Sequence, residues 1–324
     1  MSSDRNIVRQ WVEQGVLPYD QLPKALAAAK ITPNQAEWHT FIDKLLLATG
    51  ILSLGCGIIF FFAFNWQELG RIAKFALLEA FILIPALLYL RLKSDSAGAK
   101  ACLLFASLML GALIAFFGQT YQTGADPWQL FFYWAMLIIP WVVISRFSAL
   151  FMLWIALLNI SLLLYLDLYL SSFGAWFAHD TSLWLIIFVI NTLFLIVWEL
   201  LGQHDNAYAV RWGPRVLALV SGSCLTTITC FYLVDLRLES AHTLFTYPLW
   251  LFVMYYIYRR RNKDMFMLTG LGVSLLVIIA TGASMLTING LNLFVDGFFI
   301  IGILLLILTV KMANILKRIH QEDM

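Results

Sequence analysis

The chain has 324 residues, of which 61% are apolar or aromatic and only 12% are charged. Soluble domains are nearer half apolar and a quarter charged, so this composition excludes a globular cytosolic enzyme. The 21 lysines and arginines against 19 aspartates and glutamates leave a net charge of +2. Such a balance gives no sign of a nucleic-acid partner.

Residues 1–42 are polar and predict a small cytoplasmic head of two short helices, over about 6–14 and 19–29, separated by Gly15 and Pro18. Such a pair of helices either covers the end of a bundle, lies on the membrane surface or docks a partner. The segment lacks the pattern of a cleavable signal peptide, so the first apolar helix is expected to direct insertion itself.

Ten apolar stretches approach the roughly 20 residues that a helix needs to cross the hydrocarbon core. They lie at about 43–64, 72–90, 99–118, 129–145, 147–168, 183–201, 214–235, 245–258, 265–286 and 291–313. The eighth is the weakest because it is short. We therefore predict an all-α polytopic transmembrane helical bundle of about ten spans, with a head over 1–42, a transmembrane domain over 43–313 and a cytoplasmic tail over 314–324.

The distribution of basic residues supports this count. With the N-terminus inside, only Arg71, Lys74 and Arg237 of the 21 lysines and arginines fall on the outer side. Lysine and arginine collect on the cytoplasmic side of membrane proteins. We therefore expect a protein of the bacterial inner membrane whose N-terminus and C-terminus are both cytoplasmic.

Several residues inside the predicted spans favour helix packing. Asn159 and Asn191 lie deep enough to hydrogen-bond across helices, and pairs of small residues such as Gly270 and Ser274 allow close approach of backbones. The four cysteines all lie inside spans, where they are expected to be buried thiols. They are Cys56, Cys102, Cys224 and Cys230.

Two stretches are the most informative. Residues 118–131 read Gly-Gln-Thr-Tyr-Gln-Thr-Gly-Ala-Asp-Pro-Trp-Gln-Leu-Phe, and residues 60–66 form an aromatic run that ends in Asn-Trp. Together with Trp11 in the head, these stretches resemble a bacterial family of predicted membrane proteins, domain of unknown function 2157. The likeness covers about residues 1–146. It implies a polytopic inner-membrane protein of Gram-negative type beside another membrane protein, and it implies no reaction and no ligand.

The polar loop after the third span has two interpretations. In the first, Asp126 caps the fourth span with Pro127 at its first position, and Trp128 sits at the membrane interface. In the second, the loop forms a polar site on the periplasmic side. Glu79 is the strongest intramembrane candidate, since ionisable groups there are costly. The predicted polar periplasmic-side site comprises Asn65, Glu68, Arg71, Glu79, Gln119, Tyr121, Gln122 and Asp126.

No P-loop, His-Glu-x-x-His motif or intramembrane-protease motif occurs, and we expect neither a cofactor nor a metal. The first hypothesis is a non-enzymatic transporter or permease-like module. The alternatives are a non-catalytic partner or scaffold subunit of an envelope membrane complex, and an enzyme acting on a lipid-linked sugar or phospholipid with Asp126 or Glu68 as base.

The expected partners are membrane lipids and another integral membrane protein, without nucleic acid. The basic run at 259–263 either attracts anionic lipid headgroups or only anchors the topology.

Overall fold

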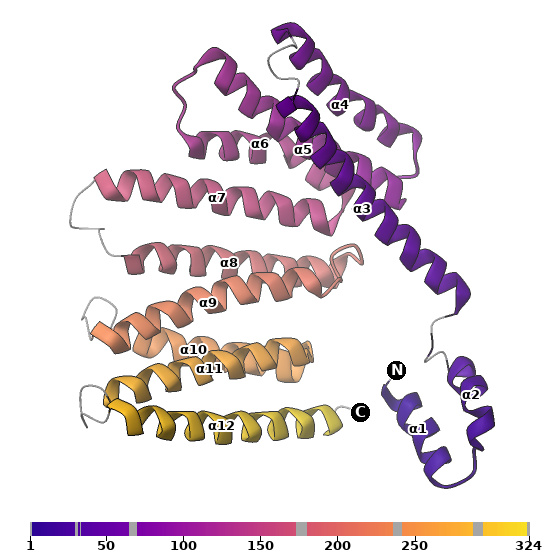
Figure 1. The fold of residues 1–324 in the computed structure, drawn as a ribbon, viewed down its shortest axis with the longest axis vertical. Coiled ribbons are helices and arrows are strands. Elements are labelled where there is room, and N and C mark those ends of the chain that lie inside the picture. The colour runs from indigo at the N-terminus through magenta and orange to yellow at the C-terminus, as the bar shows by residue number, and fades with distance from the viewer. Residues whose placement is uncertain are drawn as a thin grey trace. The chain divides into compact units, whose positions relative to one another are not determined.

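The computed structural model describes residues 2–29, 32, 34–64, 70–172, 180–235, 242–287 and 294–322, and these residues form helices without any strand (Figure 1). The elements are α1 (Ser2–Glu13), η1 (Tyr19–Gln21), α2 (Leu22–Ala28), α3 (Gln35–Phe64), α4 (Arg71–Arg91), α5 (Ala97–Tyr121), α6 (Pro127–Ser145), α7 (Ser148–Ser172), α8 (Asp180–His204), α9 (Trp212–Asp235), α10 (Thr243–Tyr256), η3 (Ile257–Arg261), α11 (Met265–Met285) and α12 (Phe294–Glu322). The all-helical class predicted from the sequence is therefore confirmed for the described residues.

The chain divides into two compact units, residues 1–124 and 125–323. In the first unit α5 packs on α4 around a core of Leu78, Phe105, Met109 and Phe116. Gly111 is buried on the same helix, where a small residue lets the backbones of neighbouring helices approach.

The helices α1 and α2 occupy the two ranges in which the sequence predicts the helices of the head. The amides of Val16 and Leu17 both donate to the carbonyl oxygen of Trp11, at 2.9 and 3.0 Å, and close the end of α1. Gly15 has a φ of 70°, in the left-handed region that favours glycine. The cytoplasmic position of this segment remains a prediction.

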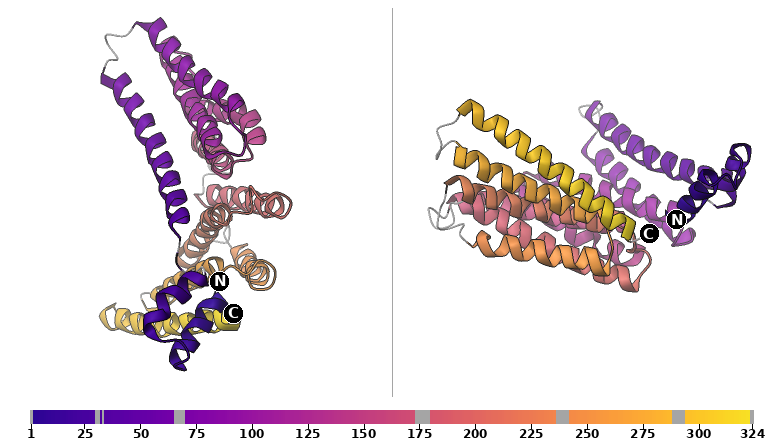
Figure 2. Two further views of the ribbon diagram at one scale, coloured as in Figure 1. Left: turned by 90° about the vertical axis from the view of Figure 1, so that its right-hand side faces the viewer. Right: turned by 90° about the horizontal axis from the view of Figure 1, so that it is seen from below.

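In the second unit the long helices lie side by side, and α9 packs against α8, α10 and α11 (Figure 2). An amide pair joins α7 to α8. Asn191 donates to the side-chain oxygen of Asn159 at 2.7 Å, and Asn159 donates in return at 3.3 Å. Each amide also donates to the backbone carbonyl four residues earlier, at 2.9 Å. The predicted hydrogen bonding of these asparagines across helices is confirmed.

Eight helices in the described part of the chain are long and apolar enough to cross a membrane, namely α4 to α9, α11 and α12. Two predicted spans are not among them. The first predicted span, at about 43–64, lies in α3, and the structure does not describe all of its side chains. The eighth corresponds to α10, whose 14 residues rise about 21 Å against a hydrocarbon core of about 30 Å. The count of ten therefore stays a prediction.

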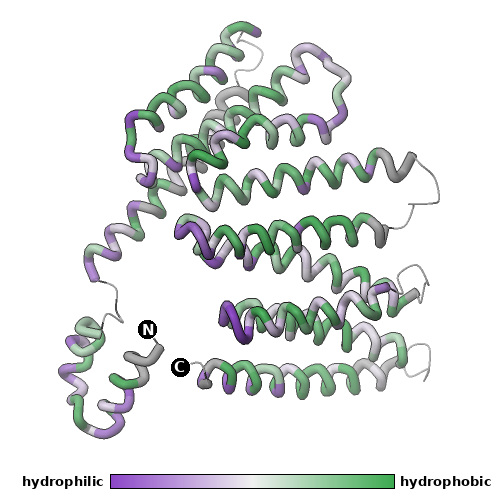
Figure 3. The backbone as a smooth tube through the Cα atoms, turned by 180° about the vertical axis from the view of Figure 1, so that it is seen from behind, coloured by the Kyte–Doolittle hydropathy of each residue, from purple (hydrophilic) through white to green (hydrophobic). Residues whose placement is uncertain are grey.

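The path of α10 nevertheless favours a crossing. Arg211, just before α9, bonds Asp264, just before α11, at 3.1 Å, so α9 and α11 begin at the same end of the unit. Because α10 and η3 connect them, these elements must return the chain along the length of α9. Figure 3 shows hydrophilic positions gathered at the end where η3 and the start of α9 lie, with apolar positions along the helices.

We expect the C-terminal end of α12 to lie in the cytoplasm, because ten crossings return the chain to the side of its N-terminus. A Glu322→Cys variant, made in a background without the native cysteines, should react with a membrane-impermeant maleimide only after spheroplasts are permeabilised. Gln122→Cys is the control and should react in intact spheroplasts. Labelling of both positions in intact spheroplasts would show that an odd number of segments cross.

Candidate functional site

The predicted periplasmic-side site is only partly assembled by the first unit. Arg71 at the start of α4 lies over the ring of Tyr121 at the end of α5, with 5.9 Å from its Cζ to the ring centroid. Phe75 and Phe117 also contact this ring, at centroid distances of 6.0 and 4.7 Å. Asn65 and Glu68 lie outside the described residues.

The other members of that site are dispersed. Glu79 is exposed on α4, eight residues or about 12 Å beyond Arg71, and within the described residues no ion pair joins the two. Gln119 and Gln122 are exposed, and Gln122 ends α5 in the left-handed conformation. The structure therefore brings together Arg71 and Tyr121 from the predicted set, and the site as a whole stays a prediction.

Asp126 belongs to the second unit and occupies the N-cap position of α6, with Pro127 first in the helix. This is the position that the capping interpretation predicts. The Asp126 side chain makes no capping hydrogen bond, however, and the turn is closed instead by the Gln129 amide donating to the Asp126 carbonyl at 3.0 Å.

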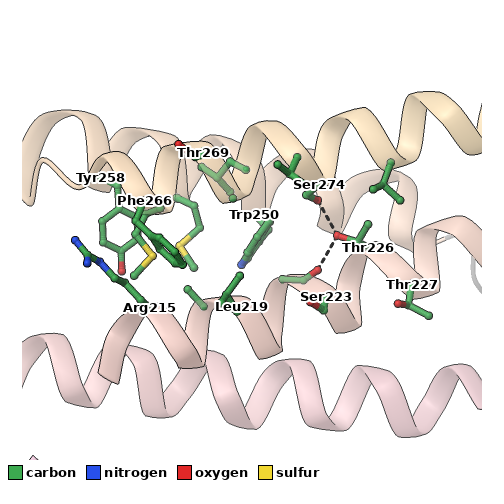
Figure 4. Close-up of a pocket in the computed structure, with 18 residues that line it drawn as sticks. Arg215, Leu219, Ser223, Thr226, Thr227, Trp250, Tyr258, Phe266, Thr269 and Ser274 are labelled. Atoms are coloured by element: carbon green, nitrogen blue, oxygen red, sulfur yellow. Dashed lines mark hydrogen bonds between the residues drawn. The ribbon is translucent and has the colours of Figure 1, made fainter. Parts of the chain in front are cut away.

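A partly open cavity of the second unit lies between α9, α10 and α11 and has a volume of about 480 Å³ (Figure 4). Its lining follows α9 from Arg215 to Thr227, twelve residues or about 18 Å of helix. Leu219, Met254 and Val277 are typical of its mainly apolar walls. Its volume is within the range of sites that bind small molecules.

A short chain of hydroxyl groups crosses the inner part of this cavity. Thr226 lies 2.7 Å from the Ser274 hydroxyl and also donates to the Gly222 carbonyl at 2.7 Å. The hydroxyl of Tyr247 is 2.8 Å from the same serine oxygen. These bonds tie α9, α10 and α11 together and give each of the three hydroxyl groups a hydrogen-bond partner.

The other end of the cavity carries an ion-pair network. Arg215 binds Asp264 in a bidentate manner, from Nε to Oδ2 and from Nη2 to Oδ1, both at 3.1 Å. Arg211 donates from Nε to the same Oδ2, also at 3.1 Å. Asp264 is only 2% exposed in its side chain, so both cations are needed to compensate a carboxylate that is withdrawn from water.

Glu199 on α8 extends the network. Its carboxylate accepts two bonds from Arg211, at 2.9 and 3.0 Å, and one each from Tyr258 and Asn262, at 2.9 and 2.8 Å. Through these bonds the network connects α8, α9, η3 and the start of α11. The π-helical turn of η3 places Tyr258, buried to 2% exposure, against Glu199; such turns are frequent at functional sites.

The local sequence explains why α9 begins here. A Cβ at Gly213 would overlap the ring of Trp198, so only glycine allows α9 to approach α8 this closely. The indole of Trp198 donates to the carbonyl of Tyr208 at 3.0 Å and fixes the connection that carries Arg211. Pro214 lies in the first turn of α9, where its missing amide hydrogen costs nothing.

The electrostatics of the network follow from this geometry. Burial alone would raise the pKa of Asp264, but the hydrogen bonds and charges of Arg215 and Arg211 outweigh it and lower that pKa. Burial likewise opposes the charge of Arg211, and its bonds to Glu199 and Asp264 raise its pKa. Asp264 and Arg211 are therefore both ionised at neutral pH. Within the described residues no three histidines, cysteines or carboxylates gather as a metal site requires.

Sequence reasoning missed the network of Arg211, Arg215, Glu199 and Asp264, because its members come from distant parts of the chain and meet only in the folded unit. One signal was present: Asp264 follows a basic run directly and precedes an apolar helix, which is typical of an N-cap. Its side chain does accept the Phe266 amide, at 3.0 Å.

Eight helices of this length and hydropathy among the described residues, each with few charged residues in its apolar stretch, define a multi-pass membrane protein. Residues 9–151 match the model of a family described as predicted membrane protein, DUF2157, so the resemblance noted in the sequence is confirmed over that stretch. No curated protein and no solved structure matches the chain. The cavity and the ion-pair network lie beyond residue 151.

Replacing Asp264 by asparagine should lower the thermal unfolding midpoint at pH 7. The free energy of unfolding should fall by about 2 kcal/mol. This is less than the roughly 3–5 kcal/mol lost when a fully buried ion pair is broken, because both guanidinium groups are partly exposed. Because the folded-state pKa of Asp264 is lowered, its stabilisation is fully present above the unfolded value near 4. It is lost progressively as the pH falls from there through the lower folded-state value.

The midpoints of the wild type and Asp264→Asn should therefore converge below about pH 4, measured in detergent at one scan rate. Asp95→Asn is the matched control, because the Asp95 side chain is 97% exposed and should contribute little. A wild-type advantage that stays constant down to pH 3 would contradict the ionic origin of the stabilisation.

Proposed function

We propose that the chain is a non-catalytic transporter or permease-like membrane protein that takes its ligand into the cavity between α9, α10 and α11. One observation carries this proposal: a partly open cavity of about 480 Å³ lies between three helices of the second unit. Ligand sites in helical bundles lie between helices and combine apolar walls with a few polar groups. This cavity has both features.

The chemistry of the walls favours binding over catalysis. The described lining residues include six hydroxyl groups and one guanidinium group; the hydroxyl groups belong to Ser223, Thr226, Thr227, Tyr258, Thr269 and Ser274. They include no carboxylate and no imidazole that would act as a general base on these hydroxyls. An enzyme acting on a lipid-linked substrate is therefore the less favoured hypothesis.

The orientation of the cavity follows from the predicted topology. With both termini in the cytoplasm of a bacterial cell, the Arg215 end of the cavity faces the cytoplasmic side of the inner membrane. The predicted periplasmic-side site remains part of the proposal as a second polar site, on the opposite side of the membrane. Arg71 and Tyr121 are the two of its residues that lie together.

A transporter requires that the cavity reach water. Thr269→Cys should therefore react with a charged, water-soluble methanethiosulfonate reagent from the cytoplasmic side. Thr309→Cys on α12 is the matched control, because both threonines are exposed within an apolar helix and bond the carbonyl four residues earlier, but only Thr269 lines the cavity. Absence of labelling at Thr269 from either side would refute a water-accessible cavity.

A scaffold role is the second candidate, favoured by apolar side chains that the head exposes. Trp11 on α1 is 48% exposed, and Val16 and Tyr19 are more exposed still. If this surface docks another integral membrane protein, deletion of residues 1–42 should remove that protein from the purified complex while the remaining chain still inserts. An unaltered complex would argue against this role.

A further inference from the structure

We infer that the cavity binds an anionic phospholipid of the cytoplasmic leaflet, with its phosphate at Arg215 and an acyl chain between α9, α10 and α11. This inference rests on the proposed function and names the class of its ligand. It follows from the shape of the cavity, from the hydrogen-bonding groups at its end and from the charge around that end.

The shape fits a chain-like apolar group. The cavity extends along α9 for about 18 Å, and the stretch between its two ends is lined by side chains such as Leu219, Trp250 and Leu271. At one end lie Arg215, Tyr258 and Phe266, and at the other Thr226 and Ser274 (Figure 4). A compact polar solute would leave the apolar middle unfilled, whereas an acyl chain buries it.

Arg215 retains the donors that a phosphate needs. Its bonds to Asp264 use Nε and one hydrogen of Nη2, so three of its five N–H groups are left, two of them on Nη1. Its side chain is 40% exposed, and its Cζ lies 5.3 Å from the centroid of the Phe266 ring. The guanidinium is thus held in place on two sides while another edge stays open. Arginine in such a position binds phosphate through paired hydrogen bonds.

The charge at this end selects an anion. Six basic side chains lie at or near it against the two carboxylates of Glu199 and Asp264. They are Arg211, Arg215, Arg259, Arg260, Arg261 and Lys263. Both carboxylates are already bonded to arginine, and Asp264 is covered by Arg211 and Arg215, so a phosphate meets mainly positive charge. Basic groups beside the membrane attract the anionic lipids of the cytoplasmic leaflet.

Native mass spectrometry of the full-length protein with chain-matched phosphatidylglycerol and phosphatidylcholine tests the inference. We expect the wild type to bind phosphatidylglycerol at least tenfold more tightly, and a large excess of inorganic phosphate not to displace it. Arg215→Gln should reduce this preference below threefold. Gly270→Leu, whose new side chain enters open space in the cavity wall and leaves the ion pairs intact, should weaken the binding of both lipids.

Arg261→Gln and Gly302→Leu are the matched controls. Arg261 contributes to the surrounding charge but lies outside the cavity lining, so Arg261→Gln should reduce the preference by no more than twofold. Gly302 on α12 also has open space at its Cβ position, so Gly302→Leu should leave the preference unchanged. An equal effect of Arg261→Gln and Arg215→Gln would overturn the inference in favour of attraction by the basic surface. Displacement of the lipid by inorganic phosphate would overturn it in favour of a simple anion site.

The outcomes also separate this inference from the function on which it rests. If the wild type binds the two lipids equally and Gly270→Leu loses both, the preference for an anionic headgroup is refuted, but the proposal that the cavity binds a ligand is retained. Unchanged lipid binding in Gly270→Leu, together with an unreactive Thr269→Cys, would refute both.

Discussion

The carboxylate of Asp264 accepts hydrogen bonds from two arginines, and the geometry of the second unit depends on this arrangement. It fixes the start of α11 beside the start of α9, and through Arg211 it also fixes Glu199 on α8. A carboxylate that is 2% exposed is stable as an anion only with such compensation. Arg215 therefore bonds Asp264 on one side and lines the cavity on the other. The bidentate bond leaves the N–H groups of Nη1 available to the cavity.

Away from this network several threonines of the second unit satisfy their hydroxyl groups within their own helix. Thr226, Thr229, Thr269 and Thr281 each donate to the carbonyl four residues earlier in their own helix. Only a few polar side chains cross between helices, and the reciprocal amide pair of α7 and α8 is the clearest of them. Without a hydrophobic force between helices in lipid, such bonds and close packing determine which helices are neighbours.

The sequence predicted the features that depend on one helix at a time. Eight of the predicted apolar stretches coincide with candidate spans, and Asn159 and Asn191 bond each other because both lie deep in apolar helices. Asp126 was placed correctly at the start of α6, but whether its side chain caps the helix depends on a rotamer that no pattern specifies. The cavity was not predictable either, because it depends on how three helices fit together. Trp250 lies so close to Gly222 that an added Cβ would be 2.9 Å from its ring, while Gly270 faces open space.

The basic residues at the end of the cavity connect topology to ligand choice. Positive charge beside a span is retained in the cytoplasm during insertion, and this alone accounts for the run at 259–261. The same rule accounts for Arg215 in the first turn of α9, where it lines the cavity. The residues that orient the chain thereby give the cavity one positive end and one hydroxyl-lined end. In the predicted topology and with the proposed ligand, the charged group of an amphiphile would lie towards the cytoplasm, so one electrostatic cause would orient both the protein and its ligand.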